Sequence, residues 1–333
     1  MTGLQMKTLL VTAASALALA ACGSAEVASP GEGNFGNGGN NGGNNGGGNT
    51  PAPGTPAADC PTGLANVGTI ANGSLRVCQL PQQILGNLSL AVRAGTIYSI
   101  SGRTEVGTDR GIDPASTTGT QGILTIEPGV KIFASSGGDY LLVNRGSQIY
   151  AEGTSTKPII FTSRQDVEGT ATATSQGQWG GIVLAGRAPQ ANCQLTAPVT
   201  CTGQVEGTNA FYGGNTATDN SGRLRYVQIK FSGFEISTGN ELQGLTMAGV
   251  GSGTTVDHIQ VHNSSDDGVE FFGGGFNARN FAIIGASDDS LDVDTGADIN
   301  LDTVIAVQRS TTGDRLIELD SPNVADRTPS NAI

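Results

Sequence analysis

From about Gly122 onward, apolar and polar residues alternate in short runs that end at glycine. The segments GILTIEPGVKIFA, LLVNRGSQIYAEG, KPIIFTS and WGGIVLAG follow one another between residues 122 and 186. Each holds a few apolar positions spaced by two, which is the side-chain period of a β-strand and not of a helix. Glycine between the runs marks corners where the chain turns. The pattern predicts an all-β protein built from short strands.

Three later segments repeat one arrangement of apolar positions at intervals of 22 to 24 residues. On the first strand the predicted columns are Leu245, Val269 and Leu291, and Met247, Phe271 and Val293. On a second strand, Ile259 is matched with Phe281, and Val261 with Ile283 and Ile305. A repeat of this length made of short strands is typical of a solenoid, in which each coil buries its inward residues by stacking on its neighbours. We therefore expect a right-handed parallel β-helix with coils of about 22 residues.

The composition agrees with this fold. Of 333 residues 51 are glycine, which is too many for a helical protein, while 37% are hydrophobic, which is enough for a core.

The N-terminus has the features of a bacterial export signal. Met6 and Lys7 open the segment MKTLLVTAASALALAAC, in which a basic residue precedes a short apolar run and then small residues. The run is too short for a good membrane span. LAAC, ending at Cys22, resembles the bacterial lipobox, which implies cleavage before Cys22 and a diacylglycerol on its sulfur. Gly23 rather than Asp after the cysteine favours the outer membrane.

The chain divides into three parts. We expect a signal peptide over residues 1–21, the lipidated Cys22 with a Gly/Asn/Pro-rich linker over 22–58, and the β-helix domain over 59–333. The linker cannot form a core, and as a flexible coil it spans roughly 30–35 Å, so that it would tether the domain to a membrane. The strand pattern stops near the C-terminus without an evident polar cap, so we expect the domain to be truncated there.

The charge excludes some partners. The net charge is −12, and loss of Lys7 with the signal peptide makes it −13. A chain this acidic is not expected to bind nucleic acid or anionic lipid through its surface, and a cation is the more natural partner.

The remaining four cysteines form two local pairs, Cys60 with Cys78 and Cys193 with Cys201. In an exported chain this arrangement predicts two disulfides. A Cys-x-x-Cys spacing or a nearby His, which would indicate zinc, is missing from these segments.

Residues 120 to 321 resemble a family of bacterial secreted and outer-membrane lipoproteins that are mostly uncharacterised. The segments that carry the resemblance include LTIEPGVKIFA, WGGIVLAG, GRLRYVQIKFSG, LQGLTMAGVGSGTTVDHIQVHNSSDDGVEFFGG and SDDSLDVDTG. The resemblance implies a right-handed β-helix of the pectate-lyase-like type. It implies no activity.

Carboxylates recur at the same interval as the coils. Asp266 and Asp288 are 22 residues apart, as are Asp267 and Asp289, and Glu270 and Asp292 follow at outward positions. Residues one coil apart in a β-helix stack at about 4.8 Å. A further coil is expected to place Asp314, Arg315, Glu318 and Asp320 beside Asp288, Asp289, Asp292 and Asp294, respectively.

Three interpretations of this acidic face remain open. Asp at a corner can cap the turn with its own side chain and otherwise be solvated. Alternatively, stacked carboxylates offer the hard oxygen ligands that Ca²⁺ accepts in loose geometry. The candidate metal ligands are Asp266, Asp267, Glu270, Asp288, Asp289, Asp292 and Asp294.

The third interpretation is catalysis on a polysaccharide, by a uronate lyase or a glycoside hydrolase. The Asp spacing is similar to that of polygalacturonases, but the Gly-His-Gly and Arg-x-Lys motifs of those enzymes are missing from the expected positions. Weak candidates for catalytic groups are Lys230, His262 and Arg315. We favour a non-catalytic lipoprotein that faces the periplasm or the cell surface. It would serve as a binding, adhesion or structural module, with a polysaccharide or cell-surface component as its possible partner.

Overall fold

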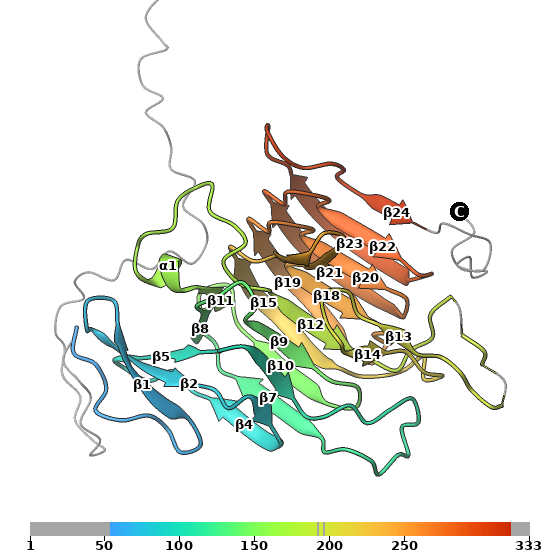
Figure 1. Cartoon of the computed structure of the whole chain (residues 1–333), viewed down its shortest axis with the longest axis horizontal. Coiled ribbons are helices and arrows are strands. Elements are labelled where there is room, and N and C mark those ends of the chain that lie inside the picture. Colours follow the sequence, from blue (N-terminus) through green and yellow to red (C-terminus); the bar gives the residue numbers. More distant parts are fainter. Residues whose placement is uncertain (1–53, 192, 196, 321–333) are drawn as a thin grey trace, which may run out of the picture. The chain divides into compact units, whose positions relative to one another are not determined.

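A computed structural model describes residues 54–191, 193–195 and 197–320. The expected signal peptide, Cys22 and most of the linker lie outside these residues. The described strands form two long sheets, A and B, in which every pairing is parallel except that of β1 with β2 (Figure 1). Sheet A contains β1 (Ala65–Ile70), β2 (Leu75–Gln79), β4 (Gly86–Leu90), β5 (Thr96–Ser99), β7 (Gly122–Ile126), β8 (Lys131–Ala134), β10 (Gln148–Glu152), β11 (Ile159–Ser163), β15 (Gly222–Lys230), β19 (Thr255–His262), β21 (Gly275–Ile284) and β23 (Asp298–Val307).

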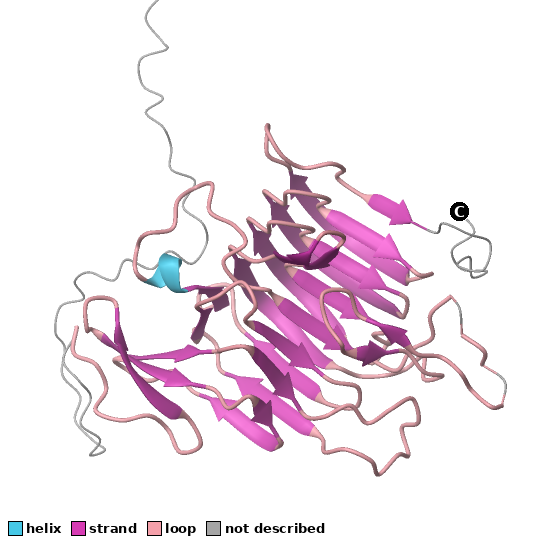
Figure 2. Cartoon of the chain, viewed as in Figure 1, coloured by secondary structure: helices cyan, strands magenta, loops and turns pink. Residues whose placement is uncertain are grey.

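Sheet B runs alongside and receives one strand from each coil. It contains β3 (Gln83–Ile84), β6 (Arg103–Val106), β9 (Tyr140–Val143), β12 (Ile182–Ala185), β18 (Leu245–Ala248), β20 (Val269–Phe272), β22 (Leu291–Asp294) and β24 (Glu318–Asp320). The chain thus passes repeatedly from a strand of sheet A to a strand of sheet B, which makes it a parallel β-helix, as predicted (Figure 2). The one helix in the described part of the chain is α1 (Arg164–Val167), and no described helix has the length and hydropathy of a membrane span.

Each long strand of sheet A bends once, and this bend gives the coil its third face. The first half of β15 pairs with β10 and the second half with β11. Tyr226, between the halves, has a φ of 49°, and the residues at the same place in the next coils, His258, Asn280 and Thr303, also have positive φ. The left-handed residue changes the strand direction, so Leu224 and Val227 both point inward although they are three residues apart.

The predicted columns of sheet B are confirmed. Leu245 faces Val269 and Val269 faces Leu291, and the column of Met247 is equally in register. On sheet A, Ile259 faces Phe281 and Val261 faces Ile283, as expected. The placement of Ile305 is wrong: Ile283 faces Ala306, and Ile305 is 58% exposed. The coil from β21 to β23 is one residue longer than 22, which moves every later residue by one position.

Two hairpins cover part of the outer face of sheet B. They are β13 (Gly203–Gln204) with β14 (Phe211–Tyr212), and β16 (Phe234–Ser237) with β17 (Asn240–Leu242). Their apolar residues pack on outward residues of β9, β12, β18 and β20 in a second hydrophobic cluster that includes Leu142, Val183, Val205, Tyr212 and Leu242. Both hairpins belong to the long insertion between β12 and β18, whose facing residues Ile182 and Leu245 are 63 positions apart.

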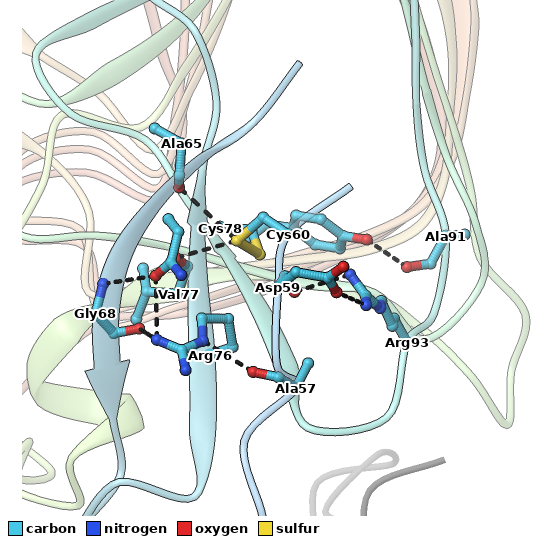
Figure 3. Close-up of a disulfide and its surroundings, with 12 residues drawn as sticks. Ala57, Asp59, Cys60, Ala65, Gly68, Arg76, Val77, Cys78, Ala91 and Arg93 are labelled. Carbon is cyan, nitrogen blue, oxygen red and sulfur yellow. Dashed lines mark hydrogen bonds and ion pairs between the residues drawn. A yellow bond between two sulfur atoms is a disulfide. The ribbon is translucent and has the colours of Figure 1, made fainter. Parts of the chain in front are cut away.

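Both expected disulfides are present, Cys60–Cys78 and Cys193–Cys201. The first fastens the beginning of the described chain to β2, with 5.4 Å between the Cα atoms (Figure 3). Nearby, Arg76 Nε donates to the carbonyl of Ala57 at 2.9 Å, and Asp59 forms an ion pair with Arg93. These contacts hold residues 57–60 against the first coil.

Candidate acidic site

The carboxylates that recur in the sequence stack in three columns next to sheet B. Glu270 faces Asp292 and Asp292 faces Glu318, as predicted, on the outer side of the strands. The same register extends into the loops that precede these strands, because the Gly268 N–H donates to the carbonyl of Asp289 at 2.9 Å. The 22-residue interval is therefore one coil.

Together with the two hairpins, these columns enclose a hollow of about 290 Å³, which we call the acidic hollow. Nine of its eleven lining residues carry a carboxyl group, and none carries an imidazole or a thiol. The lining residues are Glu206, Gly239, Glu241, Gln243, Asp266, Asp267, Glu270, Asp288, Asp289, Asp292 and Glu318.

Asp267 and Asp289 each use one carboxyl oxygen to cap the next coil. The Asp289 N–H donates to Asp267 Oδ1 at 2.9 Å, and the Arg315 N–H donates to Asp289 Oδ1 at 2.6 Å. Both aspartates are buried, with exposures of 7% and 2%. The turn-capping interpretation therefore holds for one oxygen of each aspartate, and it leaves open what the rest of the hollow binds.

Glu270 has a different environment. Its side chain is 3% exposed, and Oε2 accepts no hydrogen bond from the described residues. One carboxyl oxygen from each of Asp267, Glu270 and Asp292 lies within 4.8 Å of the others. A buried carboxyl oxygen without a donor costs free energy, which a bound cation would offset.

A second group of carboxylates lies at the outer part of the site and is already neutralised. Oxygens of Asp288, Asp289 and Asp314 lie within 4.8 Å of one another. Arg315 Nη1 is 2.8 Å from Asp314 and 2.8 Å from Glu318, and 3.9 Å from Asp289. This guanidinium occupies the place where a cation would be expected.

Burial and crowding raise the pKa values of the carboxyls in the acidic hollow. The pKa of Asp267 is raised to about 9, and the pKa values of Glu206, Asp266 and Asp289 to about 7. The pKa of Glu270 is raised well above its ordinary value. Burial is the first cause in every case, followed by nearby carboxyl groups. Without a bound cation, the hollow therefore retains protons at neutral pH.

One predicted metal ligand lies elsewhere. Asp294 does not line the acidic hollow, and its Oδ1 accepts the N–H of Thr295 at 2.6 Å. The sequence analysis also missed three lining residues, Glu206, Glu241 and Gln243, which lie in the insertion between β12 and β18. Because this insertion has no 22-residue repeat, the spacing argument could not place them.

The three weak catalytic candidates do not share a site. Lys230 faces His262 on sheet A, as expected, and Lys230 Nζ is 3.1 Å from Asp166. Burial, and then the charge of Lys230, lower the pKa of His262. Arg315 lies instead among the outer carboxylates near β24. The described residues give a metal-assisted lyase no arrangement in which these groups act together.

Fold and site define a class, the parallel β-helix with a carboxylate-lined hollow on one face. The sequence profile of the pectate-lyase-like β-helix domain matches residues 105–332. The chain belongs to this family. Searches of curated proteins and of solved structures find no match.

Proposed function

We propose that this protein is a calcium-stabilised β-helix that a lipid on Cys22 anchors in the outer membrane. It works as a non-catalytic binding or structural module that faces the periplasm or the cell surface. The lipobox-like LAAC segment supports the anchor, and the acidic hollow supports calcium. A bound cation would leave the module able to bridge to an anionic polysaccharide or another cell-surface component.

The observation that carries the calcium proposal is Glu270, a buried carboxylate with an oxygen that lacks a donor, next to two further carboxylates. Calcium takes six to eight oxygen ligands in flexible geometry, and water can supply the ligands that the protein does not. Magnesium demands a tighter octahedron. Zinc prefers His or Cys ligands, which do not line the hollow.

Thermal unfolding of the purified protein in EGTA and in millimolar Ca²⁺ tests the proposal. A ligand that binds only the folded state at about 100 times its Kd adds roughly 2.7 kcal/mol of stability. For a domain of this size, that corresponds to a rise of about 5–11 °C in Tm. An equal midpoint in both buffers, with no heat of Ca²⁺ binding in calorimetry, would show that the carboxylates are only turn caps and solvated groups.

A further inference from the structure

The acidic hollow contains a second buried oxygen that points to a ligand. Gln243 is 2% exposed, and its Oε1 accepts no hydrogen bond from the described residues. Building on the calcium site proposed above, we infer that the side-chain carbonyl of Gln243 is a neutral ligand of the same ion. Gln243 thereby helps to set where in the hollow the ion lies.

The register of the coils places Gln243 in line with the aspartates. Leu245 faces Val269, so Gln243 stands two positions before its strand, as Asp267 stands before the next one. The Gly244 N–H donates to the carbonyl of Asp267 at 3.0 Å, which shows that the register includes this loop. Gln243, Asp267 and Asp289 are therefore successive members of one column.

Within this column Gln243 differs from the two aspartates. Asp267 and Asp289 each accept a backbone N–H from the next coil through Oδ1, whereas Gln243 Oε1 accepts none. A role in capping the turn therefore does not account for the carbonyl oxygen of Gln243. Because it is buried and still lacks a donor, a cation in the hollow is the partner that fits it.

The chemistry of the amide suits the site. The side chain of Gln243 hydrogen-bonds to the carboxyls of Asp266 and Glu270, which keeps the amide inside the hollow. Its carbonyl adds an oxygen ligand without a further negative charge beside the crowded carboxylates. Calcium sites in proteins regularly include amide carbonyls of this kind. Gln243 Oε1 and Glu270 Oε2 are thus two buried oxygens without donors that line one hollow.

Terbium luminescence can separate a ligand from a residue that only positions other ligands. Tb³⁺ takes the place of Ca²⁺, and its lifetimes in H₂O and D₂O count the water molecules on the bound ion. In full-length protein, Gln243→Met should add about one bound water and weaken Ca²⁺ binding roughly ten-fold, because water replaces the lost oxygen. Gln243→Glu, which retains an oxygen at this position, should keep the wild-type water count.

Two further variants serve as checks. Gln260→Met makes the same exchange at a half-buried glutamine of β19 on sheet A and should change neither the water count nor the affinity. If Gln243→Met does not fold, Gln243→Asn withdraws the oxygen by one methylene, and we expect it to add the same water. An unchanged water count and affinity in these Gln243 variants would overturn the ligand role and leave the calcium site standing. Wild-type protein that binds neither Tb³⁺ nor Ca²⁺ would overturn both.

Discussion

Replacing Glu270 by Gln should make the protein more stable without calcium and remove its response to calcium. The exchange keeps the size of the side chain and removes one charge from the group that Glu270 forms with Asp267 and Asp292. Glu270 is almost fully buried, so water cannot screen its charge well. A residue that served only the fold would not give opposite effects in the two buffers.

The magnitude follows from the spacing of the carboxylates. Two unit charges 4.8 Å apart repel by about 3.5 kcal/mol at an effective dielectric constant of 20. Bound protons already relieve part of this repulsion, since burial and the neighbouring carboxyls raise the pKa of Glu270. We therefore expect Glu270→Gln to add about 1–3 kcal/mol in EGTA at pH 8. In saturating Ca²⁺ the wild type should gain roughly 2.7 kcal/mol and the variant almost nothing.

Urea denaturation of both proteins, in EGTA and in millimolar Ca²⁺, measures these differences. Asp298→Asn is the matched control, because it removes one negative charge from an exposed position at the start of β23. The control should behave as the wild type in both buffers. Its normal response would show that a change of net charge does not explain the result.

Two outcomes would refute this reasoning. If Glu270→Gln lowers stability in EGTA, the buried carboxylate is stabilising in the folded protein and its crowding is not a cost. If the variant keeps the full calcium response, the ion does not bind at Glu270.

Four further predictions follow from the same structure. In EGTA, stability should fall as pH rises from about 5 to about 9, because folded-state carboxyls such as Asp267, with a pKa of about 9, hold protons that the unfolded chain releases near pH 4. Urea denaturation across this range checks this, and a rise in stability with pH would contradict it. Arg315→Met should lower Tm in EGTA and enlarge the rise caused by Ca²⁺, because the outer carboxylates lose their cation; equal shifts in variant and wild type would speak against that role. Removing the Cys60–Cys78 disulfide by a double Ser substitution should cost about 2–3 kcal/mol in urea denaturation, and a smaller loss than 1 kcal/mol would disagree with the chain-entropy account. Cys22→Ser should move the protein from the outer-membrane to the soluble fraction of a Gram-negative host, and retention in the membrane would exclude the lipid anchor.

Much of the fold could be predicted because one coil length repeats. Between β18 and β22 the coils have 24 and 22 residues, so apolar columns and carboxylate columns appear directly in the sequence. The outward row of Glu270, Asp292 and Glu318 was placed correctly for this reason. A single additional residue before β23 was enough to put Ile305 in the wrong column.

The rest of the site could not be predicted, because the insertion that supplies it follows no repeat. Glu206 and Glu241 reach the hollow through hairpins that are held on sheet B by apolar contacts distant in sequence. Burial of the carboxylates is likewise a property of the assembled coils and hairpins. Only the structure distinguishes Glu270, with its unpartnered oxygen, from Asp294, whose Oδ1 accepts a backbone N–H.

The most direct test of the calcium site is a crystal structure of the protein grown in millimolar Ca²⁺, with anomalous data to locate the ion. We predict an anomalous peak in the acidic hollow at about 2.3–2.6 Å from a carboxyl oxygen of Glu270. Well-ordered density for the hollow with no anomalous peak, or a peak only at exposed carboxylates elsewhere, would contradict the account.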